Sequence, residues 1–230
     1  MYEEHHHRNI SGGGARAAVF GISDGLVSNV SLILGVAGAH SSAGAVRLAG
    51  LAGLVGGAFS MAAGEYVSMR AQSELMEREL DVERRAIQAD PEDERRELAA
   101  LYRSRGIEDD LADELSGKMM RSPELALETH AREELGFTPG HTGKPLQAAG
   151  SSFVMFAFGA LIPLLPWLVT GGTTAILWSV ALGAVASLSV GVALSFFTGR
   201  SWLWSATRQL LISGLAATVT FSIGHLVGTR

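Results

Sequence analysis

VFGISDGLVSNVSLILGVAGA, residues 19–39, is the stretch that decides the fold class of this chain. Asp24 is its only charged residue, and aliphatic and small side chains make up most of the rest. A helix needs about 20 mostly apolar residues to cross the hydrocarbon core of a bilayer. The stretch therefore predicts a transmembrane helix.

Four further windows have the same apolar character and a similar length, at 46–69, 148–169, 174–197 and 206–227. Inside a bilayer the backbone must satisfy its own hydrogen bonds, and long apolar segments do so as helices. We therefore predict an all-α, polytopic membrane protein with five transmembrane helices.

The charges gather between the second and third windows. Residues 69–146 hold 12 of the 18 Lys and Arg residues and 19 of the 23 Asp and Glu residues. Asp90-Pro91 and Ser122-Pro123 each combine an N-cap residue with a proline that starts a helix, and Gly106 and Gly136 are each suited to end one. We expect a helical-bundle insert between helices two and three. The chain then divides into a tail (1–18), two spans (19–69), the acidic insert (70–146) and three spans (147–230).

Loop charges orient the spans. The insert and the connection 197–208 carry Arg or Lys, whereas the connection 170–174 carries neither. Because positively charged loops stay in the cytoplasm, we expect the N-terminus and the insert to be cytoplasmic. The polar N-terminus lacks the apolar core of a signal peptide, so we expect no cleavage and residence in a bacterial plasma membrane. A metal-binding role for His5, His6 and His7 stays open.

Composition narrows the function. The chain has no cysteine, which excludes disulfides and thiolate metal sites and leaves oxygen, imidazole and thioether ligands. Its net charge of −5 argues against nucleic acid as a partner, while an acidic insert suits cations. No phosphate-binding loop, nucleophile triad or zinc-protease motif occurs, so we expect a transporter rather than an enzyme, with no organic cofactor.

Asp24 is the most informative single residue. A charged carboxylate in the middle of a span costs roughly 2.5–3.5 kcal/mol and usually marks an ion path; the other interpretation places it at a helix end in the interface. Met61 and Glu65 lie one helical turn apart in the second window and share a face. A thioether beside a carboxylate suits a borderline-soft ion such as Fe²⁺. We predict a transport path over Asp24, Met61 and Glu65.

The insert offers metal-ligating side chains at helical spacing. Oxygen ligands with one imidazole fit Fe²⁺, Mn²⁺ or Zn²⁺. Neighbouring arginines fit ordinary ion pairs on a solvated face, so both interpretations stay open. The pairs are Glu74 with Glu77, Glu79 with Glu83, Glu94 with Glu97, and His130 with Glu134.

Small residues recur four apart within the spans, which lets helices approach closely in lipid. Such faces pack either within one chain or across a dimer seam, and both alternatives stay open. The positions are Gly21 with Gly25, Gly53 with Gly57, and Gly183, Ser187 and Gly191.

Two motifs and the layout of the chain resemble the vacuolar iron transporter family. Residues 24–39, DGLVSNVSLILGVAGA, are similar to the first span of that family, and residues 60–68, SMAAGEYVS, to the end of its second span. The residues 134–136, Glu-Leu-Gly, and the five-span layout with an insert after span two also match. The resemblance implies a homodimer that exports Fe²⁺, often with Mn²⁺, from the cytosol in exchange for protons, with the ion path near the seam of the first spans.

The resemblance also implies roles for particular residues. It places Asp24, Met61 and Glu65 in the ion path, and it makes the insert a collector of metal. By alignment of the motifs, the glutamates that bind metal there fall on Glu83, Glu94, Glu97 and Glu134.

The chain departs from the family pattern in the insert and in the first span. The plant-type pattern has a further glutamate where this chain has Ala86, and two methionines where it has His130 and Ala131. In the first span Val27-Ser28-Asn29 replaces a proline-containing stretch. We include His130, one turn before Glu134, among the predicted metal ligands.

The hypothesis drawn from the sequence is a membrane transporter for divalent metal ions. Two alternatives from other classes stay open. One is a membrane-anchored metal buffer or sensor without transport, and the other is a structural membrane protein whose insert docks a protein partner.

Overall fold

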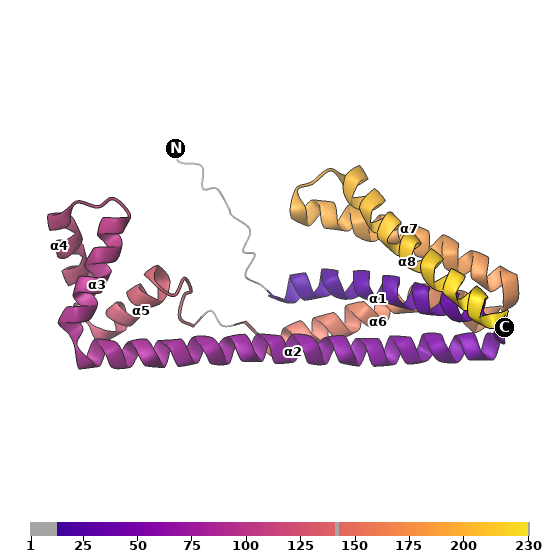
Figure 1. Ribbon diagram of the computed structural model, residues 1–230, viewed down its shortest axis with the longest axis horizontal. Coiled ribbons are helices and arrows are strands. Elements are labelled where there is room, and N and C mark those ends of the chain that lie inside the picture. Colours follow the sequence, from indigo (N-terminus) through magenta and orange to yellow (C-terminus); the bar gives the residue numbers. More distant parts are fainter. Residues whose placement is uncertain (1–12, 141–142, 230) are drawn as a thin grey trace. The chain divides into compact units, whose positions relative to one another are not determined.

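The computed structural model describes residues 13–140 and 143–229, and within them every regular element is an α-helix (Figure 1). Five of these helices are long and apolar enough to cross a membrane, which confirms the predicted all-α, polytopic membrane protein. His5, His6 and His7 lie outside the described residues. The five helices are α1 (Gly13–Gly38), α2 (Ala43–Ala89), α6 (Pro145–Val169), α7 (Gly172–Thr198) and α8 (Trp202–Gly228).

The helices form two compact units. The membrane unit combines the residues up to Ser68 with those from Lys144 onward, and the insert unit is Met69–Gly143. The apolar first part of α2 belongs to the membrane unit, and its charged part from Met69 to Ala89 belongs to the insert unit. The sequence predicts this unbroken helix, because good helix formers follow the second span directly.

Glycines on α1 allow its close packing against α6. A Cβ atom on Gly25 would overlap the carbonyl group of Phe156. Gly21 repeats the pattern one turn earlier, where a Cβ atom would lie 2.8 Å from the carbonyl oxygen of Ser152. Both glycines therefore serve a contact within the chain, which is one of the two alternatives that the sequence leaves open.

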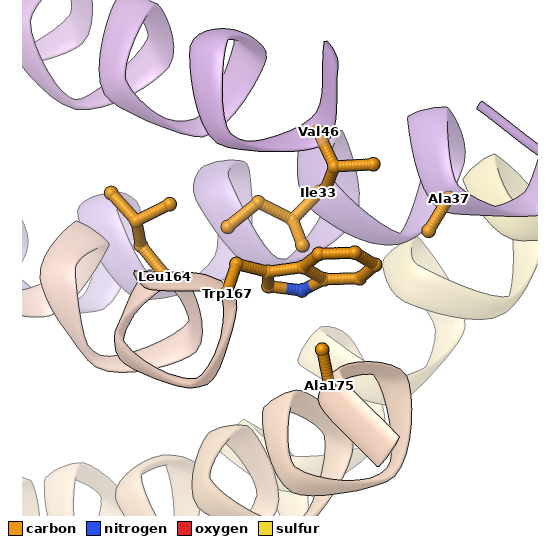
Figure 2. Close-up of a cluster of buried hydrophobic side chains, with 6 residues drawn as sticks. All are labelled: Ile33, Ala37, Val46, Leu164, Trp167 and Ala175. Carbon is orange, nitrogen blue, oxygen red and sulfur yellow. The ribbon is translucent and has the colours of Figure 1, made fainter. Parts of the chain in front are cut away.

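Trp167 lies in a buried cluster that joins four helices of the membrane unit. Its indole ring is 2% exposed and lies among side chains from α1, α2, α6 and α7 (Figure 2). Truncating a buried aromatic side chain typically costs about 3–5 kcal/mol, so this residue is a main anchor of the packing. Its partners in the cluster are Ile33, Ala37, Val46, Leu164 and Ala175.

Large apolar side chains cover outer faces of the membrane unit. Phe59 on α2, Phe197 on α7 and Leu215 on α8 are 64%, 62% and 69% exposed. In water such a surface promotes aggregation, whereas lipid tails contact it favourably. The outer faces therefore fit a bilayer.

The insert unit contains three short helices in addition to the charged part of α2. Gly106 follows the first of them and Gly136 the last, with positive φ angles of 90° and 72° that suit glycine. Both glycines lie where the sequence predicts a helix to end. The helices are α3 (Pro91–Ser104), α4 (Asp109–Met119) and α5 (Pro123–Glu133).

Side-chain caps start α3 and α5. The Asp90 carboxylate accepts a hydrogen bond from the Asp93 backbone N–H at 3.0 Å. The Ser122 hydroxyl accepts one from the Leu125 backbone N–H at 3.2 Å. Each cap satisfies a backbone donor that the first turn leaves free, so both helices begin where the sequence predicts.

Candidate functional site

Three carboxylates of the insert unit converge on His130. The side chain of His130 is fully buried, and its Nδ1 atom lies 3.0 Å from Glu83 Oε1 and 3.1 Å from Glu134 Oε1. Glu94 Oε2 lies 3.8 Å from the same nitrogen. We call these four residues the insert cluster. Three helices supply them, since Glu83 is on α2, Glu94 on α3 and the other two at the end of α5.

Local sequence positions each member of the insert cluster. The Asp90 cap places Glu94 in the first turn of α3, where the helix dipole favours a carboxylate. His130 and Glu134 are four residues apart, so they share one face at the end of α5. Ala131 is fully buried next to His130, and its small side chain lets α5 pack closely.

Burial makes the charged form of this cluster unfavourable. It is the largest cause that raises the pKa values of Glu83, Glu94 and Glu134 above the ordinary range. For Glu83 and Glu94 the neighbouring His130 opposes the rise in pKa, while nearby carboxylates add to it. Three crowded carboxylates gain more from a divalent cation than from one imidazole, so the electrostatics suit a bound metal ion.

The geometry of the cluster also suits a metal ion. Single ligand atoms of Glu83, Glu94 and His130 all lie within 4.8 Å of one another. Ligand atoms on opposite sides of one ion are separated by about 4.2 Å when each bond is near 2.1 Å. Among the described residues, Glu83 Oε1 and both His130 ring nitrogens are buried without a hydrogen bond. One oxygen from each of Glu83 and Glu94 and one ring nitrogen of His130 are therefore close enough to bind a single ion.

Glu97 lies outside this convergence. Its side chain is exposed on α3, and it acts on the cluster through its charge, which adds to the raised pKa of Glu134. Ala86 on α2 supplies no ligand where the family pattern has a glutamate. Met119 packs against the core of the insert unit around Leu98 and Tyr102.

Other acidic residues of the insert form ordinary ion pairs. Glu74 accepts a hydrogen bond from Arg70 at 2.9 Å, and Asp93 pairs with Arg96 at 2.9 Å. In each pair the two side chains are exposed, and the two residues lie three or four positions apart on the same helix. For them the interpretation as a solvated helix face fits better than metal binding.

A second group of candidate residues surrounds a cavity in the membrane unit, here called the Asp24 cavity. Asp24 of α1 and Met61 of α2 both line it, and its volume is about 280 Å³. Several polar residues also line the cavity. The sequence did not single them out as candidates, although polar residues within an apolar span can indicate a functional site. The other lining residues are Ser28, Asn29, Leu32, Gly53, Gly57, Ser60 and Phe156.

Glu65 does not line the Asp24 cavity. It lies one turn beyond Met61 on α2, and its Oε1 atom is 3.5 Å from Arg16 Nη2. The Glu65 side chain is 17% exposed, whereas the Arg16 side chain is 77% exposed. The structure therefore brings Asp24 and Met61 together and places Glu65 in a separate ion pair.

Comparison with known proteins finds a matching family and several similar proteins. The model of the VIT family matches residues 15–225 of this chain. The vacuolar iron transporter of Acanthamoeba castellanii is 35% identical over 233 residues, which cover 99% of this chain and 84% of that protein. Vacuolar iron transporter 1 of Oryza sativa subsp. japonica is 30% identical, with 100% of this chain and 92% of that protein covered. Vacuolar iron transporter 1 of Arabidopsis thaliana is also 30% identical, with 99% and 92% covered.

Proposed function

The chain belongs to the VIT family, and on that premise we propose that it is a membrane transporter that exports Fe²⁺, together with Mn²⁺, from the cytosol. The observation that carries the proposal is the cavity within the apolar spans that Asp24 and Met61 both line. Three relatives are named vacuolar iron transporters, and such names fit transport rather than enzymatic chemistry.

The chemistry of the Asp24 cavity supports passage of a divalent ion. An ionisable group is rare within membrane spans and is retained there mainly for ion or proton movement. A carboxylate together with a thioether suits a borderline-soft ion such as Fe²⁺ better than a hard ion such as Mg²⁺. Glu65, one turn away on α2, would receive the ion before Met61 and Asp24.

The insert cluster would collect metal on the cytoplasmic side. Its partly buried carboxylates and buried imidazole are all supplied by the insert unit, so binding there needs no other part of the chain. Capture raises the local concentration of the ion beside the membrane. The imidazole of His130 also suits Zn²⁺ and Mn²⁺, which are therefore alternatives as bound ions.

Protons are the proposed counter-ion. A proton and a metal ion compete for the same carboxylate, so Asp24 would be loaded with one or the other. Alternate loading from the two sides of the membrane would couple the two fluxes.

A homodimer is the proposed assembly. The apolar window of α2 is only 17% buried within one chain, and Gly56 on it has open space beside its backbone. Such a face suits either lipid or a second copy of the chain. The oligomeric state in detergent or nanodiscs tests this part of the proposal directly.

The cytoplasmic position of the insert rests on the loop charges. The three relatives are eukaryotic proteins with a vacuolar name, so they lend no support to the expected bacterial plasma membrane. An exporter with a cytoplasmic insert would load an intracellular compartment as readily as the outside of a cell.

Fe²⁺ and Mn²⁺ uptake into proteoliposomes with an imposed proton gradient tests the transport proposal. We expect wild-type protein to show flux and Asp24→Ala to show none, while both elute identically in size exclusion. Wild-type flux in Asp24→Ala would refute the path. Flux that needs Asp24 but not the gradient would keep the path and remove the proton exchange.

A membrane-anchored metal buffer or sensor is the second candidate. The observation that favours it is the insert cluster, which is complete within the insert unit. Metal binding that depends on the insert cluster, combined with no flux in wild-type proteoliposomes, would select this function.

A further inference from the structure

Asn29 is a buried amide on α1 with only half of its hydrogen bonding satisfied. The residue is 1% exposed, and its Nδ2 atom donates a hydrogen bond to the Ala160 carbonyl oxygen of α6 at 2.6 Å. Its Oδ1 atom is buried and has no hydrogen-bond partner among the described residues. The side chain therefore keeps one unsatisfied acceptor inside an apolar span.

The orientation of this amide follows from chemistry. Turning it around would bring Oδ1 against the Ala160 carbonyl oxygen, and two acceptors at that distance repel each other. The bond to Ala160 thus holds Oδ1 on the opposite side, toward α2. A buried acceptor left without a partner costs about 1–3 kcal/mol, which indicates that this oxygen has a partner in the working protein.

Asn29, which carries the unsatisfied oxygen, is one of the residues that line the Asp24 cavity. Asn29 and Gly53 both line this cavity, and a Cβ atom on Gly53 would lie 2.7 Å from Asn29 Oδ1. A Cβ atom at position 53 would also lie 2.5 Å from Leu32 Cδ2, so any larger residue there would crowd both side chains. Asp24 and Met61 line the same cavity, so residues that carry a carboxylate, a thioether and an amide surround one small space.

We propose that Asn29 Oδ1 is a neutral oxygen ligand of the carried ion, alongside the Asp24 carboxylate and the Met61 thioether. This inference rests on the proposed transport function and adds a ligand that determines specificity. A carbonyl oxygen favours ions that prefer oxygen, so it strengthens binding of Mn²⁺ more than binding of softer ions. It also leaves Asp24 as the only charged group among the lining residues of the cavity, so release of the ion is not hindered by a second negative charge.

Two variants of the full-length protein test the assignment by different routes. Asn29→Leu removes the oxygen, together with the Nδ2 donor to Ala160, and keeps the number of side-chain heavy atoms. Gly53→Ala keeps the Asn29 side chain, but places a methyl group against Oδ1 and against Leu32 Cδ2. Gly150→Ala on α6 is the control, because a Cβ atom there meets nothing within 4 Å.

The measurement is the concentration dependence of Mn²⁺ and Fe²⁺ uptake into proteoliposomes, with size exclusion to confirm folding. We expect Asn29→Leu and Gly53→Ala to raise the KM for Mn²⁺ about 10- to 100-fold and the KM for Fe²⁺ by less, with Gly150→Ala unchanged. An equal loss of maximal rate for both ions at constant KM would overturn the inference, since a purely structural role predicts that result. If Asn29→Leu does not fold, an unchanged KM in Gly53→Ala overturns it alone.

The outcomes separate this inference from the transport proposal. Wild-type flux that needs Asp24 but has the same Mn²⁺ KM in Asn29→Leu would refute the ligand role and leave the transporter intact. Flux that is indifferent to Asp24→Ala, or absent in wild type, would refute the path and the ligand role together.

Discussion

Replacing Glu83 by Gln is expected to remove most of the metal-dependent stabilisation of the protein. Glu83 Oε1 lies 3.0 Å from His130 Nδ1, and its side chain is 12% exposed, so an ion held there has Glu83 as a direct ligand. Gln has almost the same shape and no charge. Because burial raises the pKa of Glu83, the metal-free fold disfavours its charge, and the neutral Gln removes that cost. The metal-free variant is therefore expected to be at least as stable as wild type.

The magnitude follows from linkage. A Mn²⁺ concentration of 100 times Kd stabilises the wild type by about 2.7 kcal/mol. Loss of outer-shell groups weakens metal sites about 10- to 100-fold, and a direct ligand matters at least as much. At the same Mn²⁺ concentration, a hundredfold weaker site leaves only about 0.4 kcal/mol.

The assay is unfolding of the detergent-solubilised, full-length protein in Mn²⁺ and in EDTA. Glu77→Gln is the control, because Glu77 is exposed on the same helix and lies outside the insert cluster. Glu77→Gln should keep the wild-type Mn²⁺ shift, whereas Glu83→Gln should lose most of it. An equal Mn²⁺ shift in Glu83→Gln and wild type would refute the assignment of the insert cluster as a metal site.

Three further predictions concern pH, packing and the ion path. The raised carboxyl pKa values of the insert cluster mean that the metal-free fold binds protons more tightly than the unfolded chain. Their contribution to stability is present below pH 4.5 and is lost as pH rises through the raised pKa values. The Mn²⁺-induced shift should grow over the same range, and unfolding at a series of pH values in EDTA and in Mn²⁺ checks both. Gly159→Ala should lower the free energy of unfolding by about 1–3 kcal/mol through overpacking, since its Cβ atom would overlap the Ile22 carbonyl. Gly150→Ala on the same helix is the control, because it has open space and should have little effect on unfolding. Glu65→Gln should lower Fe²⁺ flux yet leave the fold intact, because the exposed pair with Arg16 contributes at most about 1 kcal/mol; unchanged flux would remove Glu65 from the path.

The sequence by itself determined the elements of this protein. A bilayer fixes the length and apolar character of each span, so the five transmembrane helices are visible in composition alone. The caps at Asp90 and Ser122 and the stops at Gly106 and Gly136 act on neighbouring residues, so they too can be read locally. The two motifs that resemble the vacuolar iron transporters added the candidate residues.

Only the tertiary structure decided which of those residues meet. By helical spacing, the pair Glu94 with Glu97 and the pair His130 with Glu134 are equally good candidates for a metal site. In the structure, however, Glu97 is exposed, whereas His130 is buried beside Glu83. Their convergence depends on the packing of helices that are distant in sequence, which no local pattern encodes.

The roles of the glycines and of Asn29 likewise depend on the helices packed against them, which the sequence does not show. Gly21 and Gly25 fit either a dimer seam or an internal contact until α6 is seen to pack against them. Asn29 looks like a tolerated polar residue until its amide nitrogen is found on Ala160 and its oxygen beside Gly53. Local sequence sets which groups a helix carries, but only its neighbours in space decide which of those groups remain without a partner.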